Sequence, residues 1–267
     1  MNLKEGQIRE FQTRGILRLE DFIPATIATA AQRVALKKLS KFYENGNWDF
    51  ESVKDLPFPK ANKVFNKSLG SLKPFKSLLT SDLLQLISQL MGEDAIPWMK
   101  FQLLCSVPDT SKWEVPSTTW HLDMPMIENK GLPGIQMFTF LTEVRAGGGG
   151  TLAVAGSHRQ LDELSQFKPK ALRSVLKKEA FFRNLWSKEY PERQELMKET
   201  LTANGGSVQV IEMHGKPGDI YLMDLRILHT VAPNSLESPR IMLTQRFAKR
   251  EMLAATEELR KAYLEKI

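Results

Sequence analysis

The chain has 267 residues, of which 42% are hydrophobic, and this is enough to form a well-buried core. Its formal net charge is +6, but its basic residues are scattered among carboxylates, which favours a solvated surface over a nucleic-acid interface. The single cysteine, Cys105, cannot form an internal disulfide, and no apolar run approaches the roughly 20 residues that span a membrane. The charged N-terminal residues do not resemble a signal peptide, so we expect a cytoplasmic protein without membrane or nucleic-acid partners.

Two segments in the first third of the chain have the apolar spacing of helices. Residues 80–92 read as a helix that Thr80 or Ser81 can cap and Gly92 can end. In residues 24–46 the apolar side chains fall near one helical face: Ile27, Ala31, Val34, Ala35, Leu39 and Phe42. We therefore expect residues 1–97 to form a helical support for the rest of the chain.

From about residue 98 the sequence consists of short apolar and β-branched runs separated by Gly and Pro, which is typical of strands. The runs are residues 98–107, 135–144, 150–158, 207–215, 218–231 and 240–248. A charged, helix-prone insertion, residues 159–203, interrupts them, and residues 249–267 read as a closing helix. The pattern predicts one domain, mainly β with flanking helices, whose core (98–248) is a sandwich or barrel.

A candidate metal site begins with His121 and Asp123. On a strand these residues point to the same side, although a histidine and an aspartate at this spacing also occur together by chance. His229, at the end of another predicted strand, supplies a second imidazole. Two histidines and one carboxylate are the ligands of non-haem Fe(II) oxygenases, and a zinc hydrolase would accept the same set.

Arg240 separates these two possibilities. It follows His229 by eleven residues and opens the next predicted strand. A guanidinium there can hold a carboxylate through two parallel hydrogen bonds. An oxygenase that uses 2-oxoglutarate needs such a group for the distal carboxylate, whereas hydrolysis does not, so Arg240 favours an oxygenase.

Three segments together, HLD (121–123), GGGTLAVAGSHR (148–159) and GDIYLMDLRILHTVAPNSLESPRIMLTQRF (218–247), resemble the phytanoyl-CoA dioxygenase family of Fe(II)/2-oxoglutarate oxygenases. The resemblance covers roughly residues 98–248 and implies a double-stranded β-helix, the jelly roll of cupin-like proteins. It implies that His121, Asp123 and His229 bind Fe(II) and that Arg240 anchors 2-oxoglutarate. The implied reaction uses O2 to hydroxylate an unactivated C–H bond of a small organic substrate, with release of succinate and CO2.

The chain departs from related enzymes at Val231 and Met242, where a hydroxyl residue often helps to hold the cosubstrate. Gln102 and Thr139 are candidates for the missing contacts, and both could equally be polar residues at a sheet surface. These departures leave a non-catalytic jelly-roll module that binds a metal or small acid as an alternative. Asp123 itself favours hydroxylation, or another oxidation that begins with hydrogen abstraction, because halogenating relatives carry a small residue there.

Four further residues are candidates for substrate contacts. Met124 follows the triad aspartate, and Phe138 lies on a neighbouring predicted strand whose alternation leaves its facing open. The insertion at 159–203 is a candidate lid, with Arg183 and Trp186 contacting the substrate; the alternative is that its aromatic residues only pack it onto the barrel. Family members act on acyl-CoA thioesters, amino acids and natural products, and the sequence does not choose among them.

Overall fold

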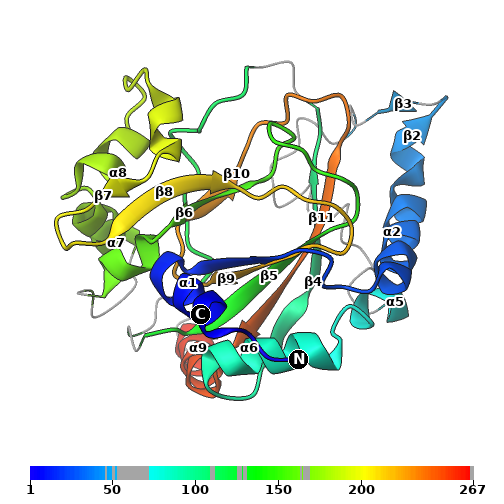
Figure 1. Cartoon of the computed structure of the whole chain (residues 1–267), viewed down its shortest axis with the longest axis horizontal. Coiled ribbons are helices and arrows are strands. Elements are labelled where there is room, and N and C mark those ends of the chain that lie inside the picture. Colours follow the sequence, from blue (N-terminus) through cyan, green and yellow to red (C-terminus); the bar gives the residue numbers. More distant parts are fainter. Residues whose placement is uncertain are drawn as a thin grey trace.

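The structure, a computed structural model, describes residues 1–45, 47–49, 52, 72–108, 112–124, 128, 131–162, 164 and 169–264. Its core consists of two antiparallel sheets that face each other, with helices on the outside (Figure 1). The expected jelly roll with flanking helices is therefore confirmed. The boundaries drawn for a single domain, with an insertion at 159–203, stay a prediction.

The larger sheet has five strands in the order β1 (Ile16–Leu19), β9 (Ile220–Asp224), β5 (Gly134–Phe140), β11 (Arg240–Ala248) and β4 (Ile96–Ser106). The second sheet has four strands, β10 (His229–Val231), β6 (Thr151–Ala155), β8 (Ser207–Glu212) and β7 (Thr200–Leu201). A short ribbon pairs β2 (Tyr43–Glu44) with β3 (Asn47–Trp48). Each run predicted as a strand thus contains one, and the run at 218–231 contains two.

Strand β1 corrects the expectation that residues 1–97 only form a helical support. Helix α1 (Glu5–Arg14) ends at Gly15, which adopts a left-handed conformation with φ of 69°. The chain then turns into the sheet and pairs with β9, with Ile16 on the inner face and Leu17 on the outer face. A Cβ atom at Gly15 would lie 2.7 Å from the ring of His158, so both the backbone conformation and the close packing require glycine there.

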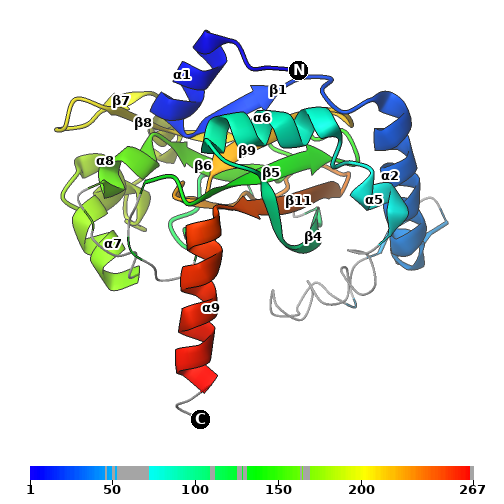
Figure 2. The same ribbon diagram turned by 90° about the horizontal axis from the view of Figure 1, so that it is seen from below.

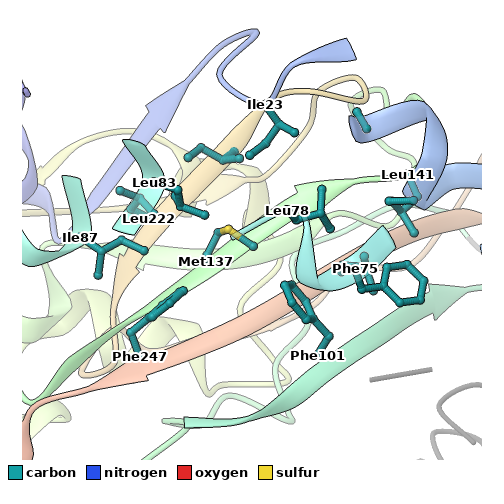
Figure 3. Packing of buried hydrophobic residues seen from close by; sticks show 14 of the residues in the cluster. Ile23, Phe75, Leu78, Leu83, Ile87, Phe101, Met137, Leu141, Leu222 and Phe247 are labelled. Carbon is teal, nitrogen blue, oxygen red and sulfur yellow. The ribbon is translucent and has the colours of Figure 1, made fainter. Parts of the chain in front are cut away.

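Helices α2 (Ala25–Leu39), α5 (Lys73–Lys76) and α6 (Ser81–Met91) lie on the outer side of the five-stranded sheet (Figure 2). The short η1 (Ser40–Phe42) joins the same core through Phe42. The expected caps of α6 are present, since Thr80 Oγ1 accepts from the amide of Leu83 and Gly92 ends the helix with φ of 74°. Leu83 and Ile87 of α6 point toward Met137 of β5 (Figure 3). Full burial of such a side chain stabilises the fold by about 1.5–3 kcal/mol.

The insertion forms η2 (Ser157–Leu161), α7 (Pro169–Leu176), α8 (Ala180–Leu185) and η3 (Arg193–Met197). Its buried residues Phe181, Phe182 and Leu185 share a cluster with Leu152 and Val154, on the outer face of the four-stranded sheet. The closing helix α9 (Arg250–Leu264) extends away from the sheets (Figure 2). Of the helices in the described ranges, none combines the length and apolarity that a membrane crossing requires.

The space between the sheets positions the site. On β11, Ile241, Leu243 and Phe247 face the helices and belong to the outer core. The alternate residues face the interior: Arg240, Met242, Thr244 and Arg246. Three of these four inward residues are polar, and buried polar side chains require polar partners within the interior.

Candidate metal centre

Three side chains that can bind a metal ion converge between the sheets. His229 begins β10, and an isolated antiparallel bridge joins it to His121. The two imidazole rings lie 4.4 Å apart between centroids. With Asp123, they offer three ligand atoms that all lie within 4.8 Å of one another, an arrangement that can hold one ion.

Each histidine of the triad is oriented by a main-chain carbonyl. Nδ1 of His121 lies 2.8 Å from the oxygen of Thr119, and Nδ1 of His229 lies 3.0 Å from that of Ile227. Because a carbonyl oxygen only accepts, each Nδ1 carries the proton. The unprotonated Nε2 atoms then lie beside the carboxylate of Asp123, at 3.8 Å for His121 and 3.5 Å for His229. This is the tautomer that a metal ion requires.

The protonation states of the triad also suit a metal. Burial alone would raise the pKa of Asp123, but the proximity of His229 and the guanidinium of Arg246 hold this pKa well below its usual range. Burial and the neighbouring His229 lower the pKa of His121, which favours its neutral form. The site therefore offers a carboxylate and two imidazole nitrogens, of which that of His121 is shifted toward its neutral form. This donor set fits iron, and three protein ligands leave coordination positions open for other molecules.

Arg240 is a buried guanidinium without a carboxylate partner among the described residues. It is 2% exposed; its Nη1 donates to Thr151 Oγ1 at 3.4 Å and lies 3.8 Å from Sδ of Met242. Its Nε has no hydrogen-bond partner in the part of the chain that the structure describes. Burial lowers the pKa of Arg240 to about 10, although Cys105 and Glu212 favour the charged form. A buried cation with an unused donor fits a carboxylate ligand.

Arg240 and the triad face the same interior space. Strand β10 pairs with β6 so that His229 lies opposite Ala153 and Val231 lies opposite Thr151. Thr151, which contacts Arg240, is therefore two residues, or about 7 Å, along the strand from the position opposite His229. Val231, opposite Thr151, is 42% exposed.

The structure places Gln102 in the surroundings of Asp123. Gln102 lies on β4 opposite Thr244, and its Oε1 accepts from Arg246 Nη1 at 3.2 Å. Arg246 in turn donates to Asp123. Gln102 thus reaches the metal centre through Arg246, and its contact with a cosubstrate stays a prediction.

Thr139 is not brought to the centre. It pairs with Leu243 of β11 and Ile220 of β9, whose side chains belong to the outer core, and its hydroxyl donates to the carbonyl of Asp219 at 3.0 Å. This corrects the expectation of a cosubstrate contact, because the register of β5 turns the Thr139 side chain toward the helices. The sequence could not fix that register.

The register of β5 also determines the direction of the Phe138 side chain. It pairs with Thr244 and Tyr221 on the inner face and is 1% exposed. Met124 is partly buried and packs against the cluster between the insertion and the four-stranded sheet. For both residues, contact with a substrate stays a prediction.

Arg183 and Trp186 are used within the insertion. Arg183 donates to the carbonyl oxygens of Lys177 and Lys178, just after α7, at 3.0 and 2.6 Å. The Trp186 ring lies 5.3 Å from the guanidinium carbon of Arg173. Trp186 also packs against the cluster that joins the insertion to Leu152 and Val154, which matches the alternative in which the aromatic residues pack the insertion onto the barrel. A substrate contact by either residue stays a prediction.

The sequence reading missed Arg246 and Gln136, which both bond to Asp123. They lie opposite each other on β11 and β5. Arg246 is six residues after Arg240, so strand alternation from Arg240 would have placed it on the inner face. Polar residues in a strand are more often read as solvent-facing, which hid this signal.

Solved structures share the fold. AviO1 from Streptomyces viridochromogenes Tue57 matches with 17% identity and a TM-score of 0.56, over 92% of this chain and 94% of that one. EctD from S. alaskensis, solved with bound Fe, matches with 14% identity and a TM-score of 0.58, over 94% and 78%. The non-heme alpha ketoglutarate dependent carbocyclase SnoK from nogalamycin biosynthesis matches with 15% identity and a TM-score of 0.55, over 92% and 84%. At these identities the likeness establishes the fold alone.

A comparison with curated protein sequences finds no match. The family model described as phytanoyl-CoA dioxygenase (PhyH), however, matches residues 11–242, which is most of the chain. The match includes His121, Asp123, His229 and Arg240. As the resemblance of its motifs predicted, the chain belongs to the phytanoyl-CoA dioxygenase family.

Proposed function

We propose that the chain is an Fe(II)- and 2-oxoglutarate-dependent dioxygenase that hydroxylates an unactivated C–H bond of a small organic substrate. The observation that carries this proposal is Arg240, a buried guanidinium that has no carboxylate partner among the described residues and faces the same interior as the triad. A metal site alone would suit a hydrolase as well. Thr151, which contacts Arg240, lies about 7 Å along β6 from the position opposite His229, and a carboxylate anchor there suits a five-carbon 2-oxo diacid that also reaches the metal.

In this proposal His121, Asp123 and His229 hold Fe(II), and Arg240 binds the distal carboxylate of 2-oxoglutarate. When bound, Fe(II) and 2-oxoglutarate supply the oxidising chemistry with O2, with succinate and CO2 as by-products. Main-chain carbonyls accept from the Nδ1 atoms of both histidines, which leaves the two Nε2 atoms to bind the metal. The Arg240 guanidinium is buried, and Met242 lies beside it with Sδ 3.8 Å from Nη1, so water is largely excluded there and its attraction for an anion is stronger.

Hydroxylation is proposed over halogenation because Asp123 occupies the carboxylate position. The solved neighbours include a carbocyclase and an epimerase, SnoK and SnoN. The proposal therefore covers oxidation at a C–H bond, with hydroxylation as the expected outcome. The substrate class is a small molecule such as an acyl-CoA, an amino acid or a natural product, and the cytoplasmic location stays a prediction from the sequence.

The first test is an anaerobic titration of the protein with Fe(II) and then 2-oxoglutarate. A 2-oxo acid that chelates Fe(II) gives a weak visible absorption band. We expect the band in the wild type, its loss in His229→Ala, and a much higher 2-oxoglutarate requirement in Arg240→Met. Succinate release in air then provides a screen for substrates.

The outcomes separate the candidate functions. Fe(II) binding without any band would favour the binding module, and Val231 and Met242 would then explain the lost cosubstrate. Tight zinc binding with hydrolysis and no response to 2-oxoglutarate would favour the hydrolase.

A further inference from the structure

Arg246 connects the metal ligand Asp123 to the edge of the five-stranded sheet. Its side chain is 10% exposed, and its Nη2 donates to Oδ2 of Asp123. Its Nη1 donates to Oε1 of Gln102 at 3.2 Å and lies 3.7 Å from Sδ of Met99. The two terminal nitrogens are thus directed to different groups, so the guanidinium cannot rotate without losing one of them.

Arg246 lies where the pairing of β11 with β4 is irregular. Thr244 is opposite Gln102, but Arg246 is opposite Trp98, so β4 advances four residues while β11 advances two. The amide of Gln245 compensates, since its Nε2 donates to the carbonyl of Trp98 at 3.2 Å. The irregularity therefore leaves the strands bonded on both sides of Arg246.

The two carboxylate oxygens of Asp123 have different surroundings. Oδ2 accepts from Arg246 and, at 3.1 Å, from Nε2 of Gln136. Nε2 of Gln136 is itself held by Thr244, whose Oγ1 accepts from it at 3.0 Å. Within the described ranges no hydrogen bond is donated to Oδ1, which lies 3.8 Å from Nε2 of His121.

We infer that Arg246 and Gln136 position Asp123 as a ligand with one coordinating oxygen. They hold Oδ2, which also lies 3.5 Å from Nε2 of His229, and leave Oδ1, on the side of His121, free to bind the metal. Arg246 acts through Asp123, so it is a positioning residue. The inference rests on the proposed function, because it requires a metal ion at the triad.

A charge effect and a positioning effect of Arg246 have opposite signs. Its positive charge lies close to the place of a dication, so charge alone would weaken metal binding, and removal of the guanidinium would strengthen it. If Arg246 positions Asp123, its removal frees the carboxylate to rotate and weakens metal binding. Groups that orient a metal ligand typically change metal affinity about 10- to 100-fold.

The experiment is calorimetric titration of the metal-free protein with Co(II), together with the visible spectrum of the Co(II) complex. We expect Arg246→Met to weaken Co(II) binding about 10- to 100-fold and to alter the spectrum as the second carboxylate oxygen reaches the metal. Arg246→Lys should rescue only partly, because one ammonium cannot replace the fork that holds both Asp123 and Gln102. Gln136→Leu should show a smaller loss.

Arg250→Met is the matched control, because Arg250 makes an exposed ion pair with Asp94. It should bind Co(II) like the wild type. Thermal unfolding of each metal-free variant shows whether the fold is retained. If Arg246→Met does not fold, the Co(II) affinities and spectra of Arg246→Lys and Gln136→Leu test the inference instead.

The inference is overturned if Arg246→Met binds Co(II) as tightly as the wild type, or more tightly, and shows the wild-type spectrum. If that variant does not fold, the same result in both Arg246→Lys and Gln136→Leu overturns it. The assignment of the metal site would stand in either case. A wild type that binds Co(II) no better than His229→Ala overturns the proposed function instead. The two failures are therefore distinguishable in one set of titrations.

Discussion

The main chains of His121 and His229 are hydrogen-bonded to each other in both directions, since the amide of each donates to the carbonyl of the other at 3.0 Å. The two imidazoles are therefore placed by the backbone, before any metal binds. Asp123, two residues beyond this bridge, is placed mainly by its side-chain contacts. The ligands of the triad should consequently respond differently to mutation.

We predict that His121→Ala and Asp123→Ala both abolish metal binding but differ in stability. The side chain of His121 is 51% exposed, so its loss should cost little. Asp123→Ala leaves Arg246 without its anionic partner, and an unsatisfied buried donor costs about 1–3 kcal/mol. Because the pKa of Asp123 is lowered in the fold, the stabilisation from its pairing with Arg246 is present at neutral pH. It is lost as the pH falls below the usual range of a carboxyl group. Thermal unfolding of the metal-free variants at pH 7 measures the difference; equal melting temperatures would contradict it.

Arg240→Met should raise the stability of the ligand-free protein and remove its response to 2-oxoglutarate. The guanidinium is buried, and its Nε has no described partner, so its replacement relieves a penalty of about 1–3 kcal/mol. Wild-type protein with Fe(II) should gain melting temperature on addition of 2-oxoglutarate, because the ligand binds only the folded state. A variant that is less stable than the wild type without ligand, or is still stabilised by 2-oxoglutarate, would argue against this role.

Arg193 links the insertion by hydrogen bonds to the segment that leads into His121, and Arg193→Met should destabilise both segments. Arg193 is 6% exposed and donates to the carbonyls of Val115, Leu185 and Ser187. Charge-assisted bonds of this kind contribute about 1.5–3 kcal/mol each, and a chain of this size loses about 2 °C of melting temperature per kcal/mol, so we expect a fall of roughly 9–18 °C for the three.

Arg183→Met is the control for Arg193→Met, because Arg183 is exposed and its two bonds stay within the insertion. It should shift the melting temperature much less. Limited proteolysis should cut the insertion faster in Arg193→Met only. Similar melting and cleavage in both variants would mean that Arg193 does not tie the two segments together.

Cys105 should resist alkylation in the folded protein. Burial raises the pKa of its thiol from 9.0 to about 12, although Arg240 opposes part of this shift. At pH 8.5 the thiolate fraction is then about 1000-fold lower than in the unfolded chain, and iodoacetamide should react correspondingly slowly. Because the folded pKa is raised, the thiol stabilises the fold below pH 9, and this stability is lost as the pH rises toward 12. Cys105→Ala should flatten that alkaline slope; rapid native labelling would contradict the assignment.

Much of the fold could be predicted, because the apolar runs have the lengths and punctuation of strands. The helix at 80–92 has its cap at Thr80 and its end at Gly92, and the structure confirms both. The strand at Ile16–Leu19 was missed because only four residues carry it and its partner, β9, is about 200 residues away. Local periodicity does not report such a pairing.

The site was predictable where residue identity carries the chemistry. The triad and Arg240 are chemically unusual in their order and spacing, and the structure brings them to one interior. Thr139 and Arg246 were misplaced or missed because their roles depend on strand register, which a change of one residue would reverse. The presence of a glutamine or an arginine in a strand does not indicate which face of the sheet its side chain occupies.

The irregular pairing of β4 with β11 divides the inner wall of the jelly roll into two parts that should tolerate insertions and deletions differently. From Arg240 to Thr244 the strands keep a regular register with Ser106 to Gln102. Beyond it, three residues of β4, at positions 99–101, lie opposite Gln245 alone. Relatives that gain or lose a residue within 99–101 should therefore keep Arg240, the carboxylate anchor, in place, whereas Arg246, which holds Asp123, should shift. A change of length in this short stretch can thus alter the metal centre without altering cosubstrate binding.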